Sequence, residues 1–229
     1  MTTTSDLWHH FGRARAEHDR AVPHAFHWVW SQDGGPGSEV LGDLTGKVVG
    51  DLGAGAARHA AHLVAHGAPA RVDAVDASPA QHAMAGDLFG HLAPRLRLVR
   101  SDVVDHLRTT ADAYDVLYSV FGAVDFTHPG ELLPAVAARL RPGGLLAFST
   151  LAHYLGGASA ESDVVAAGIP AKTPTGEAAT LRRWVLQEHV WTKVLDTSGF
   201  TRIRVERLPS ATDLPRSAET LLVTAVRHA

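Results

Sequence analysis

A short apolar run followed by a glycine-rich turn constrains this chain more than any other stretch. Residues 48–52 read Val-Val-Gly-Asp-Leu, which predicts a buried strand that closes on the carboxylate of Asp51. Gly53 and Gly55 follow, and a helix is expected to start at about Ala56. Glycines let the backbone approach a ligand closely, and the first turn of a helix offers free N–H groups. The stretch therefore predicts a small-molecule site between a strand and a helix.

The spacing within this turn separates two kinds of nucleotide-binding motif. The dinucleotide fingerprint G-x-G-x-x-G requires a small residue at position 58, where this chain has Arg58. The Asp51 carboxylate would also repel a pyrophosphate, whereas it suits a ligand that carries an ammonium group. The run from Asp51 to Ala57 resembles the first motif of class I S-adenosylmethionine (SAM)-dependent methyltransferases, acid-x-Gly-x-Gly-x-Gly, with Ala57 in place of the last glycine. The resemblance implies that the cofactor contacts Asp51, Gly53, Ala54 and Gly55.

Composition excludes several other classes of protein. The 229 residues are 45% hydrophobic, which is enough to fill the core of one domain. A net charge of −3 without a basic tract disfavours a nucleic-acid partner. The chain has no cysteine, so disulfides and thiolate metal sites are excluded. No signal peptide or membrane-spanning run is visible. These features predict a soluble cytoplasmic protein without a membrane partner.

Strand and helix patterns alternate after residue 47, which predicts a doubly wound, mostly parallel α/β sheet with the ligand at the carboxyl ends of its strands. With the resemblance, this becomes a Rossmann-like seven-stranded methyltransferase sheet in a single domain. The expected strands are 48–52, 71–76, 95–100, 114–120, 144–150, 201–208 and 220–227, with a further one at 181–186. The expected helices are 56–65, 79–91, 129–140 and 188–197. The domain divides into an N-terminal helical cap (1–46), a cofactor-binding core (47–152), a lid or acceptor segment (153–187), and a closing helix and hairpin (188–229).

Two segments outside the core admit more than one interpretation. Residues 5–31 carry apolar residues at helical spacing with a break at Pro23, which predicts one or two helices. Their aromatics either pack on the sheet or cap the site. Residues 156–176 are small, polar and interrupted by Pro170 and Pro174, which predicts an irregular lid or loop.

The resemblance extends to the ends of the later strands. Asp76 closes the second strand and is expected to bind both ribose hydroxyls through its carboxylate. The resemblance implies that the Asp102 carboxylate binds the adenine amino group and that the Val103 N–H meets a ring nitrogen. Ser101-Asp102 could also cap a helix, and the two roles are compatible. Leu140-Arg141-Pro142-Gly143-Gly144 matches the family's turn before the fifth strand. The remaining cofactor contacts implied by the resemblance are Ala77, Gln81, Val103 and the backbone of Ser119.

The mechanism implied is direct SN2 transfer of the activated methyl group to a small-molecule acceptor, which yields S-adenosylhomocysteine and needs no metal. Oxygen or nitrogen is the expected acceptor atom, oxygen slightly preferred and carbon less favoured, within a biosynthetic pathway. His153 and His128 follow the fifth and fourth strands and are the first candidates for a general base. Candidate acceptor-lining residues are His24, Trp28, Trp30, Phe121, Tyr154 and Trp184. The alternative is a protein with the same fold that binds SAM without methylating.

Overall fold

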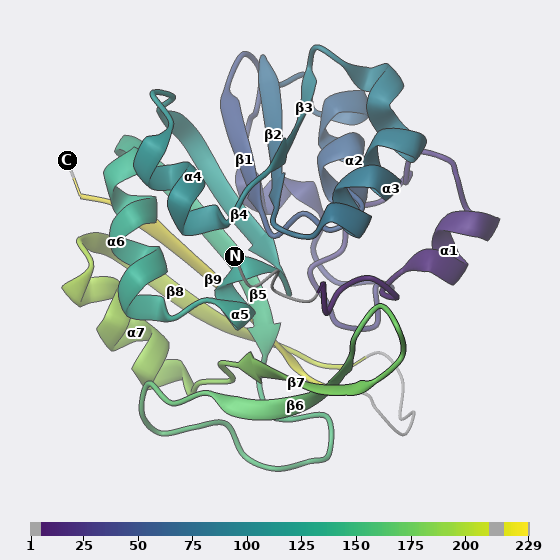
Figure 1. Ribbon diagram of the computed structural model, residues 1–229. Coiled ribbons are helices and arrows are strands. Elements are labelled where there is room, and N and C mark those ends of the chain that lie inside the picture. The colour runs from purple at the N-terminus through teal and green to yellow at the C-terminus, as the bar shows by residue number, and fades with distance from the viewer. Residues whose placement is uncertain (1–5, 211–217, 229) are drawn as a thin grey trace.

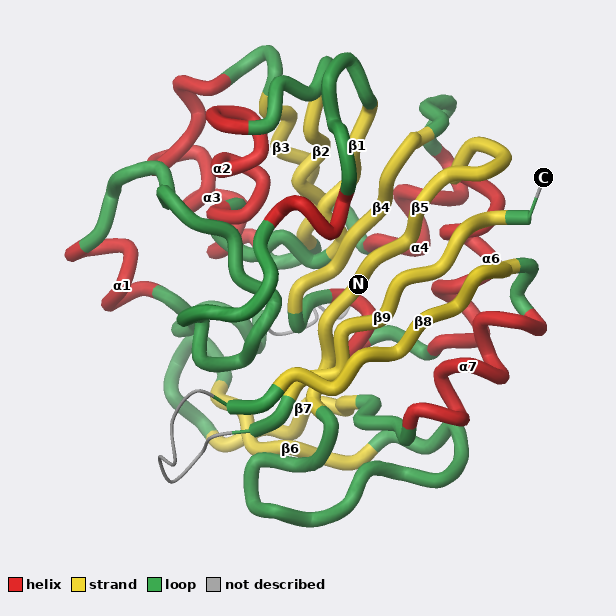
Figure 2. The backbone as a smooth tube through the Cα atoms, turned by 180° about the vertical axis from the view of Figure 1, so that it is seen from behind, coloured by secondary structure: helices red, strands yellow, loops and turns green. Residues whose placement is uncertain are grey.

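A seven-stranded sheet runs through the computed structural model, which describes residues 6–210 and 218–228 (Figure 1). Its strands are β1 (Val48–Leu52), β2 (Arg71–Asp76), β3 (Leu96–Arg100), β4 (Tyr114–Val120), β5 (Leu140–Leu151), β8 (Phe200–Leu208) and β9 (Thr220–Arg227). The spatial order is β3-β2-β1-β4-β5-β9-β8, and Figure 2 shows the strands side by side. β1 to β5 are parallel, while β9 is antiparallel to β5 and β8. The winding reverses between β1 and β4, which is where ligands bind in sheets of this type.

Helices cover both faces of the sheet (Figure 1). α2 (Arg58–His66) and α3 (Pro79–Phe89) form one layer, and α4 (Val103–Thr109), α6 (Pro129–Arg139) and α7 (Glu188–Thr197) form the other. Shorter elements are α1 (Arg13–His18), α5 (Ala123–Phe126) and the 3₁₀ turns Ser38–Leu41 and Gly90–Leu92. None of the described helices has the length and apolar content that crossing a lipid bilayer would require.

Local chemistry explains several element boundaries. α3 begins where Ser78 caps it by accepting a hydrogen bond from the backbone N–H of Gln81, and Pro79 occupies the first helical position. β5 starts at Leu140, four residues earlier than expected, because Leu140 already pairs with Tyr114 of β4. The register then shifts across the proline-glycine turn, in which Gly143 has φ +74°.

The N-terminal region contradicts the helices expected over residues 5–31. Within residues 6–31, α1 is the one stretch of α-helix, and the rest consists of turns and extended backbone. The side-chain amide of Gln81 binds the carbonyls of Trp8 and Phe11, which a longer helix would use in its own ladder. The apolar residues Phe26, Trp28 and Val29 instead join the core cluster that contains α2 and α3, while Phe11 is 63% exposed.

The segment after β5 contains a hairpin that the sequence reading missed in part. β6 (Ala167–Lys172) lies within the expected loop and pairs antiparallel with β7 (Ala178–Arg183). β7 overlaps the strand expected at 181–186 but starts and ends three residues earlier. β6 is rich in alanine and glycine and contains Pro170, so its strand propensity is weak. The hairpin crosses beneath the carboxyl ends of the parallel strands (Figure 1), the position at which a lid would act.

Candidate active site

The glycine-rich turn joins β1 to α2 at the carboxyl edge of the sheet. Gly53 has φ +79°, and a Cβ atom there would overlap the backbone nitrogen of Ala123. Glycine at this position is therefore required by the contact between the turn and the segment after β4. Ala57 adopts the left-handed conformation (φ 58°, ψ 27°), which explains why glycine is usual at the equivalent place in the motif.

The carboxylate of Asp51 is buried beside this turn. The residue is 2% exposed, and the hydroxyl of Tyr118 on β4 donates a hydrogen bond to Oδ2 at 2.8 Å. Burial raises the pKa of Asp51 to about 7; the hydrogen bond from Tyr118 lowers it, and the charge of Asp76 raises it. This carboxyl group therefore titrates near neutral pH as long as no cation compensates it.

Asp76 closes β2 on the other side of the turn. Its Oδ2 accepts a hydrogen bond from the Gly55 N–H at 2.8 Å, and its Oδ1 accepts one from the Ser78 N–H at 2.9 Å. Burial raises the pKa of Asp76, although these two bonds lower it. Neither Asp51 nor Asp76 forms a salt bridge with an arginine or lysine among the described residues. The turn is therefore flanked by two uncompensated carboxyl groups.

Residues 6–11 form a strap across this region. The Gln81 amide donates hydrogen bonds of 2.9 Å to the carbonyls of Trp8 and Phe11. Asp6 accepts hydrogen bonds from the hydroxyl of Ser78 at 2.9 Å and from the backbone of α3. Gln81, which the resemblance places beside the adenosine, therefore also holds the strap.

The strap reaches from α3 to the opposite side of the site. The Trp8 ring packs edge-on against Phe126 of α5, with 4.6 Å between centroids. Nε2 of His10 lies 3.0 Å from the carbonyl oxygen of Thr173 in the turn between β6 and β7. The strap thus contacts α3, α5 and the hairpin.

The remaining strand ends converge on the same edge. Asp102 caps α4, because its Oδ1 accepts hydrogen bonds from the N–H groups of Val104 and Asp105 at 2.8 and 3.1 Å. The Ser101 N–H donates to the carbonyl of Asp76. Ser119 is buried at the end of β4, and its hydroxyl donates to the Leu52 carbonyl at 2.8 Å. Ala77 is exposed next to Asp76, and Val103 is buried in the first turn of α4.

A buried ion pair lies just beyond the end of β4. Asp125 of α5 is 0% exposed, and its Oδ2 accepts hydrogen bonds from Nε and Nη2 of Arg183 on β7, at 3.0 and 2.5 Å. The guanidinium carbon lies 5.3 Å from the ring centroids of both Trp30 and Phe126. Burial raises the pKa of Asp125, while the charge of Arg183 and the nearby hydroxyl of Thr150 lower it.

Residues 49–144 match the family model described as a methyltransferase domain. This part of the chain is a methyltransferase domain. The match runs from β1 into the first residues of β5 and contains the glycine-rich turn together with Asp51, Asp76 and Asp102.

Solved structures show that the methyltransferase domain has the class I SAM-dependent fold. A candidate SAM-dependent methyltransferase from Listeria monocytogenes superposes with a TM-score of 0.65 at 20% identity, covering 84% of this chain and 96% of that one. The 1,6-didemethyltoxoflavin-N1-methyltransferase of Burkholderia thailandensis superposes with a TM-score of 0.54 at 24% identity. The superposition covers 81% of this chain and 72% of that one. A SAM-dependent methyltransferase from Mesorhizobium loti superposes with a TM-score of 0.59 at 22% identity. The superposition covers 82% of this chain and 94% of that one. A search of curated protein sequences found no match.

Both histidines proposed as a base are engaged by backbone groups. His128 caps α6, and its Nδ1 accepts a hydrogen bond from the Gly130 N–H at 3.0 Å. His153 places Nδ1 3.0 Å from the Tyr154 carbonyl, which requires a proton on Nδ1. Its Nε2 then accepts a hydrogen bond from the Glu219 N–H at 3.3 Å. Neither ring offers a free lone pair in this arrangement.

The aromatic residues expected to line the acceptor site separate into two groups. Trp30 and Phe121 pack edge-on at 5.0 Å beside the ion pair, Phe121 at a strained φ of 46°. Tyr154 donates its hydroxyl to Glu161 and packs near them. Trp184 is buried against His128, at the N-terminus of α6.

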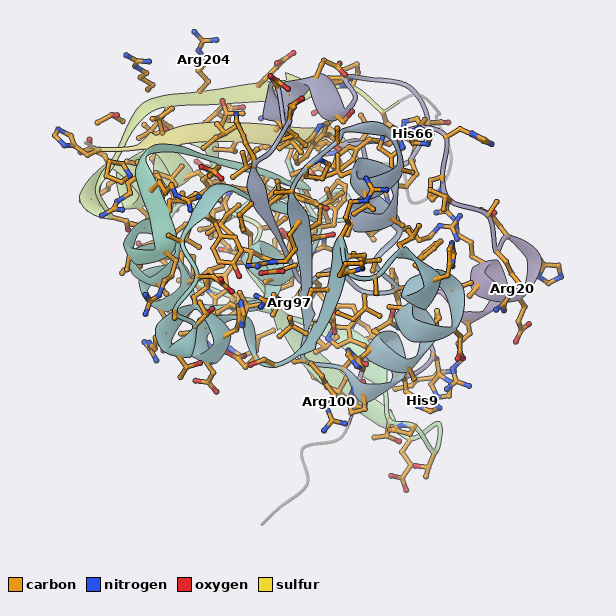
Figure 3. All side chains as sticks on the ribbon, turned by 90° about the horizontal axis from the view of Figure 1, so that it is seen from above. His9, Arg20, His66, Arg97, Arg100 and Arg204 are labelled. Carbon is orange, nitrogen blue, oxygen red and sulfur yellow. The ribbon has the colours of Figure 1, made fainter. Side chains whose placement is uncertain are left out.

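Two expected lining residues lie elsewhere. Trp28 is 0% exposed and belongs to the core, with its ring against Tyr118 and its Nε1 donating to the Gly37 carbonyl. His24 packs beside His66 at the C-terminal end of α2. Figure 3 shows His66 at the end of the sheet opposite to Arg100, which closes β3. His24 therefore lies away from the carboxyl edge, because α2 carries the chain back to the amino ends of the strands.

The sequence did not predict a role in the site for Tyr118, Asp125, Arg183 or the strap. An acid among apolar residues just beyond the fourth strand is a signal that could have singled out Asp125. The other three depend on contacts between segments far apart in the chain.

Proposed function

We propose that this chain transfers the methyl group of SAM to an oxygen or nitrogen of a small-molecule acceptor, in a cytoplasmic biosynthetic pathway. The observation that carries the proposal is the pair of carboxyl groups on either side of the glycine-rich turn, the buried Asp51 and the half-buried Asp76. Two carboxylates without a cationic partner suit a ligand that brings an ammonium group and a sulfonium, and they oppose a pyrophosphate.

The roles of the residues follow from their positions. Asp51 would accept the ammonium group of the amino-acid portion, together with the backbone at Ser119. Asp76 would accept the ribose hydroxyls, because each of its oxygens keeps a lone pair beyond the hydrogen bond it already makes. The exposed Asp102, with the Val103 backbone, would meet the adenine.

The chemistry asks little of the protein beyond alignment. SAM supplies a methyl group on a positively charged sulfur, which is already activated. The chain has to place the acceptor atom behind that methyl group and to exclude water, a proximity effect worth several kcal/mol, on the order of 7–11 kcal/mol at most. The strap and the hairpin provide covers that can exclude water.

A small-molecule acceptor is supported by what relatives of this fold bind. The Burkholderia enzyme holds 1,6-didemethyltoxoflavin, and the phosphoethanolamine N-methyltransferase 2 of Haemonchus contortus holds phosphomonomethylethanolamine. In this chain Trp30, Phe121 and Phe126 surround the region beyond β4, which favours a planar, partly apolar acceptor.

Calorimetry tests the proposal directly. S-adenosylhomocysteine is expected to bind with a one-to-one stoichiometry, and NAD is not. Asp76→Ala is expected to weaken that binding at least tenfold, since two charge-assisted hydrogen bonds are lost. Asp163→Ala, an exposed aspartate on the segment after β5, is the matched control and should leave it unchanged.

Turnover is tested by release of S-adenosylhomocysteine over a panel of phenols, amines and N-heterocycles. Binding of NAD alone would overturn the assignment. Tight binding of S-adenosylhomocysteine without turnover across the panel would favour a SAM-binding protein that does not methylate.

A further inference from the structure

The two oxygens of the buried Asp125 carboxylate differ in their hydrogen bonding. Oδ2 takes both hydrogen bonds from Arg183, whereas Oδ1 has no hydrogen-bond partner within 3.5 Å among the described residues. The hydroxyl of Thr150, at the end of β5, lies near enough to lower the pKa of Asp125, yet within the described part of the chain it forms no hydrogen bond either. A fully buried carboxylate oxygen without a donor is costly, so such an atom indicates a group that is completed by a ligand.

The fold places this carboxylate next to the cofactor side of the site. α5 follows directly from β4, and its first residue, Ala123, touches Gly53 of the glycine-rich turn. The hydroxyl of Ser119 links the same segment to the end of β1. Asp125 therefore lies one turn of chain beyond the contact between β4 and the cofactor-binding turn.

The surroundings of Asp125 suit an aromatic acceptor. The rings of Trp30 and Phe126 flank the Arg183 guanidinium at 5.3 Å each, and Phe121 packs against Trp30. The strap contacts Phe126 and β7 supplies Arg183, so the strap and the β6–β7 hairpin cover this region.

The two histidines first considered as a base are engaged by the backbone. Nδ1 of His128 accepts from a backbone N–H, so that ring can take a proton there only by giving up the cap of α6. Both ring nitrogens of His153 bind backbone groups. Asp125 is the buried carboxyl group of the acceptor side that keeps one oxygen free.

We propose that Asp125 is the general base of this methyltransferase and that its acceptor is an aromatic hydroxyl. The hydroxyl oxygen forms a bond to the methyl carbon while the carbon–sulfur bond breaks and its electron pair stays on sulfur. The proton of the hydroxyl passes to Oδ1 of Asp125. Arg183 is a positioning residue that holds Oδ2 and keeps the carboxylate ionised between turnovers. The inference rests on the function proposed above.

Methylation rates of two phenols distinguish a general base at Asp125 from a carboxylate with a purely structural role. At pH 8 the hydroxyl of 4-nitrophenol is largely ionised, whereas that of phenol is not, so only phenol needs a base. Asp125→Asn is expected to lower kcat/KM for phenol by about 10²–10⁴-fold and for 4-nitrophenol by less than about tenfold. The double variant Asp125→Asn/Arg183→Met removes both buried charges, and it replaces the single variant if that one does not fold.

The control is a second buried aspartate in an ion pair. Asp73 is 0% exposed and binds Arg71 and Arg97 on β2 and β3, so Asp73→Asn should affect both phenols equally, if at all. Equal losses for both phenols in Asp125→Asn would reduce Asp125 to a structural role and overturn the proposal. So would an unchanged rate with phenol, or a wild-type protein that binds S-adenosylhomocysteine and methylates neither phenol. Failure of the wild type to bind S-adenosylhomocysteine would instead refute the function proposed above.

Discussion

Burial of Asp51 in the core makes ionisation of its carboxyl group unfavourable. A buried carboxyl group with a single hydrogen-bond donor, Tyr118, is expensive to ionise, and its pKa of about 7 measures that expense. An arriving ammonium group would compensate the charge. The residue is therefore organised for ligand binding, and replacing it should separate stability from function.

Asp51→Asn is expected to stabilise the protein more at pH 8 than at pH 5. Because the folded-state pKa is raised from 3.8 to about 7, the stability that Asp51 contributes is fully present below pH 3.8 and is lost progressively as the pH rises from there through 7. The variant lacks that loss, so its advantage in the free energy of unfolding should grow to about 2–4 kcal/mol at pH 8. Urea unfolding at both pH values measures it, together with a weaker affinity for S-adenosylhomocysteine. An advantage that does not change with pH would contradict this account.

Gly53 offers a test of backbone contact. Gly53→Ala is expected to cost more than about 3 kcal/mol of unfolding free energy and to abolish S-adenosylhomocysteine binding, because its Cβ would press on the Ala123 backbone. Gly143 has a similar φ, +74° against +79°, and no atom lies within 4 Å of the place that its Cβ would take. Gly143→Ala should therefore cost only about 1 kcal/mol, and equal losses in chemical denaturation would refute the contact argument.

At the scale of elements, the β6–β7 hairpin depends on α5. Beyond the Arg183 ion pair, the backbone N–H of Trp184 donates to the Asp125 carbonyl at 2.8 Å. Arg182 lies over the Trp184 ring, and that ring packs on His128. α5 and the end of β7 therefore form one unit, which couples the cover of the site to the segment that follows β4.

Arg183→Met is expected to destabilise the protein by about 3–5 kcal/mol, because it leaves the Asp125 carboxylate buried without a counter-charge. The double variant Asp125→Asn/Arg183→Met should recover much of that loss, since both charges are then absent. A double-mutant cycle in urea measures the coupling energy. Additive losses would mean that the two side chains do not stabilise one another.

At the scale of the whole molecule, the proposed cofactor site draws on β1, β2, β3 and β4 together with the strap. Ligand that binds only this assembled state stabilises all of it by mass action. S-adenosylhomocysteine at a hundred times its Kd should add about 2.7 kcal/mol to the unfolding free energy. For a chain of this size that corresponds to a rise in Tm of about 5–10 °C. Scanning calorimetry measures the shift, and an equal shift with NAD would contradict the proposed ligand.

The sequence by itself determined the parallel core and the edge at which a ligand binds. Interactions between neighbouring residues define several elements, which periodicity and cap chemistry therefore predict. These are the strands β1, β2 and β4, the caps at Ser78 and Asp102, and the glycine-rich turn. The family resemblance then pointed to Asp51 and Asp76, which flank the turn, and their roles in cofactor binding stay a prediction.

Only the tertiary structure decided how the site is closed and which side chains remain free. Tyr118 reaches Asp51 from 67 residues away, and Arg183 reaches Asp125 across 58. The strap is extended because Gln81 takes its carbonyls, and the histidines that looked available bind backbone groups. Such pairings depend on the packing of distant segments, and no local propensity encodes them.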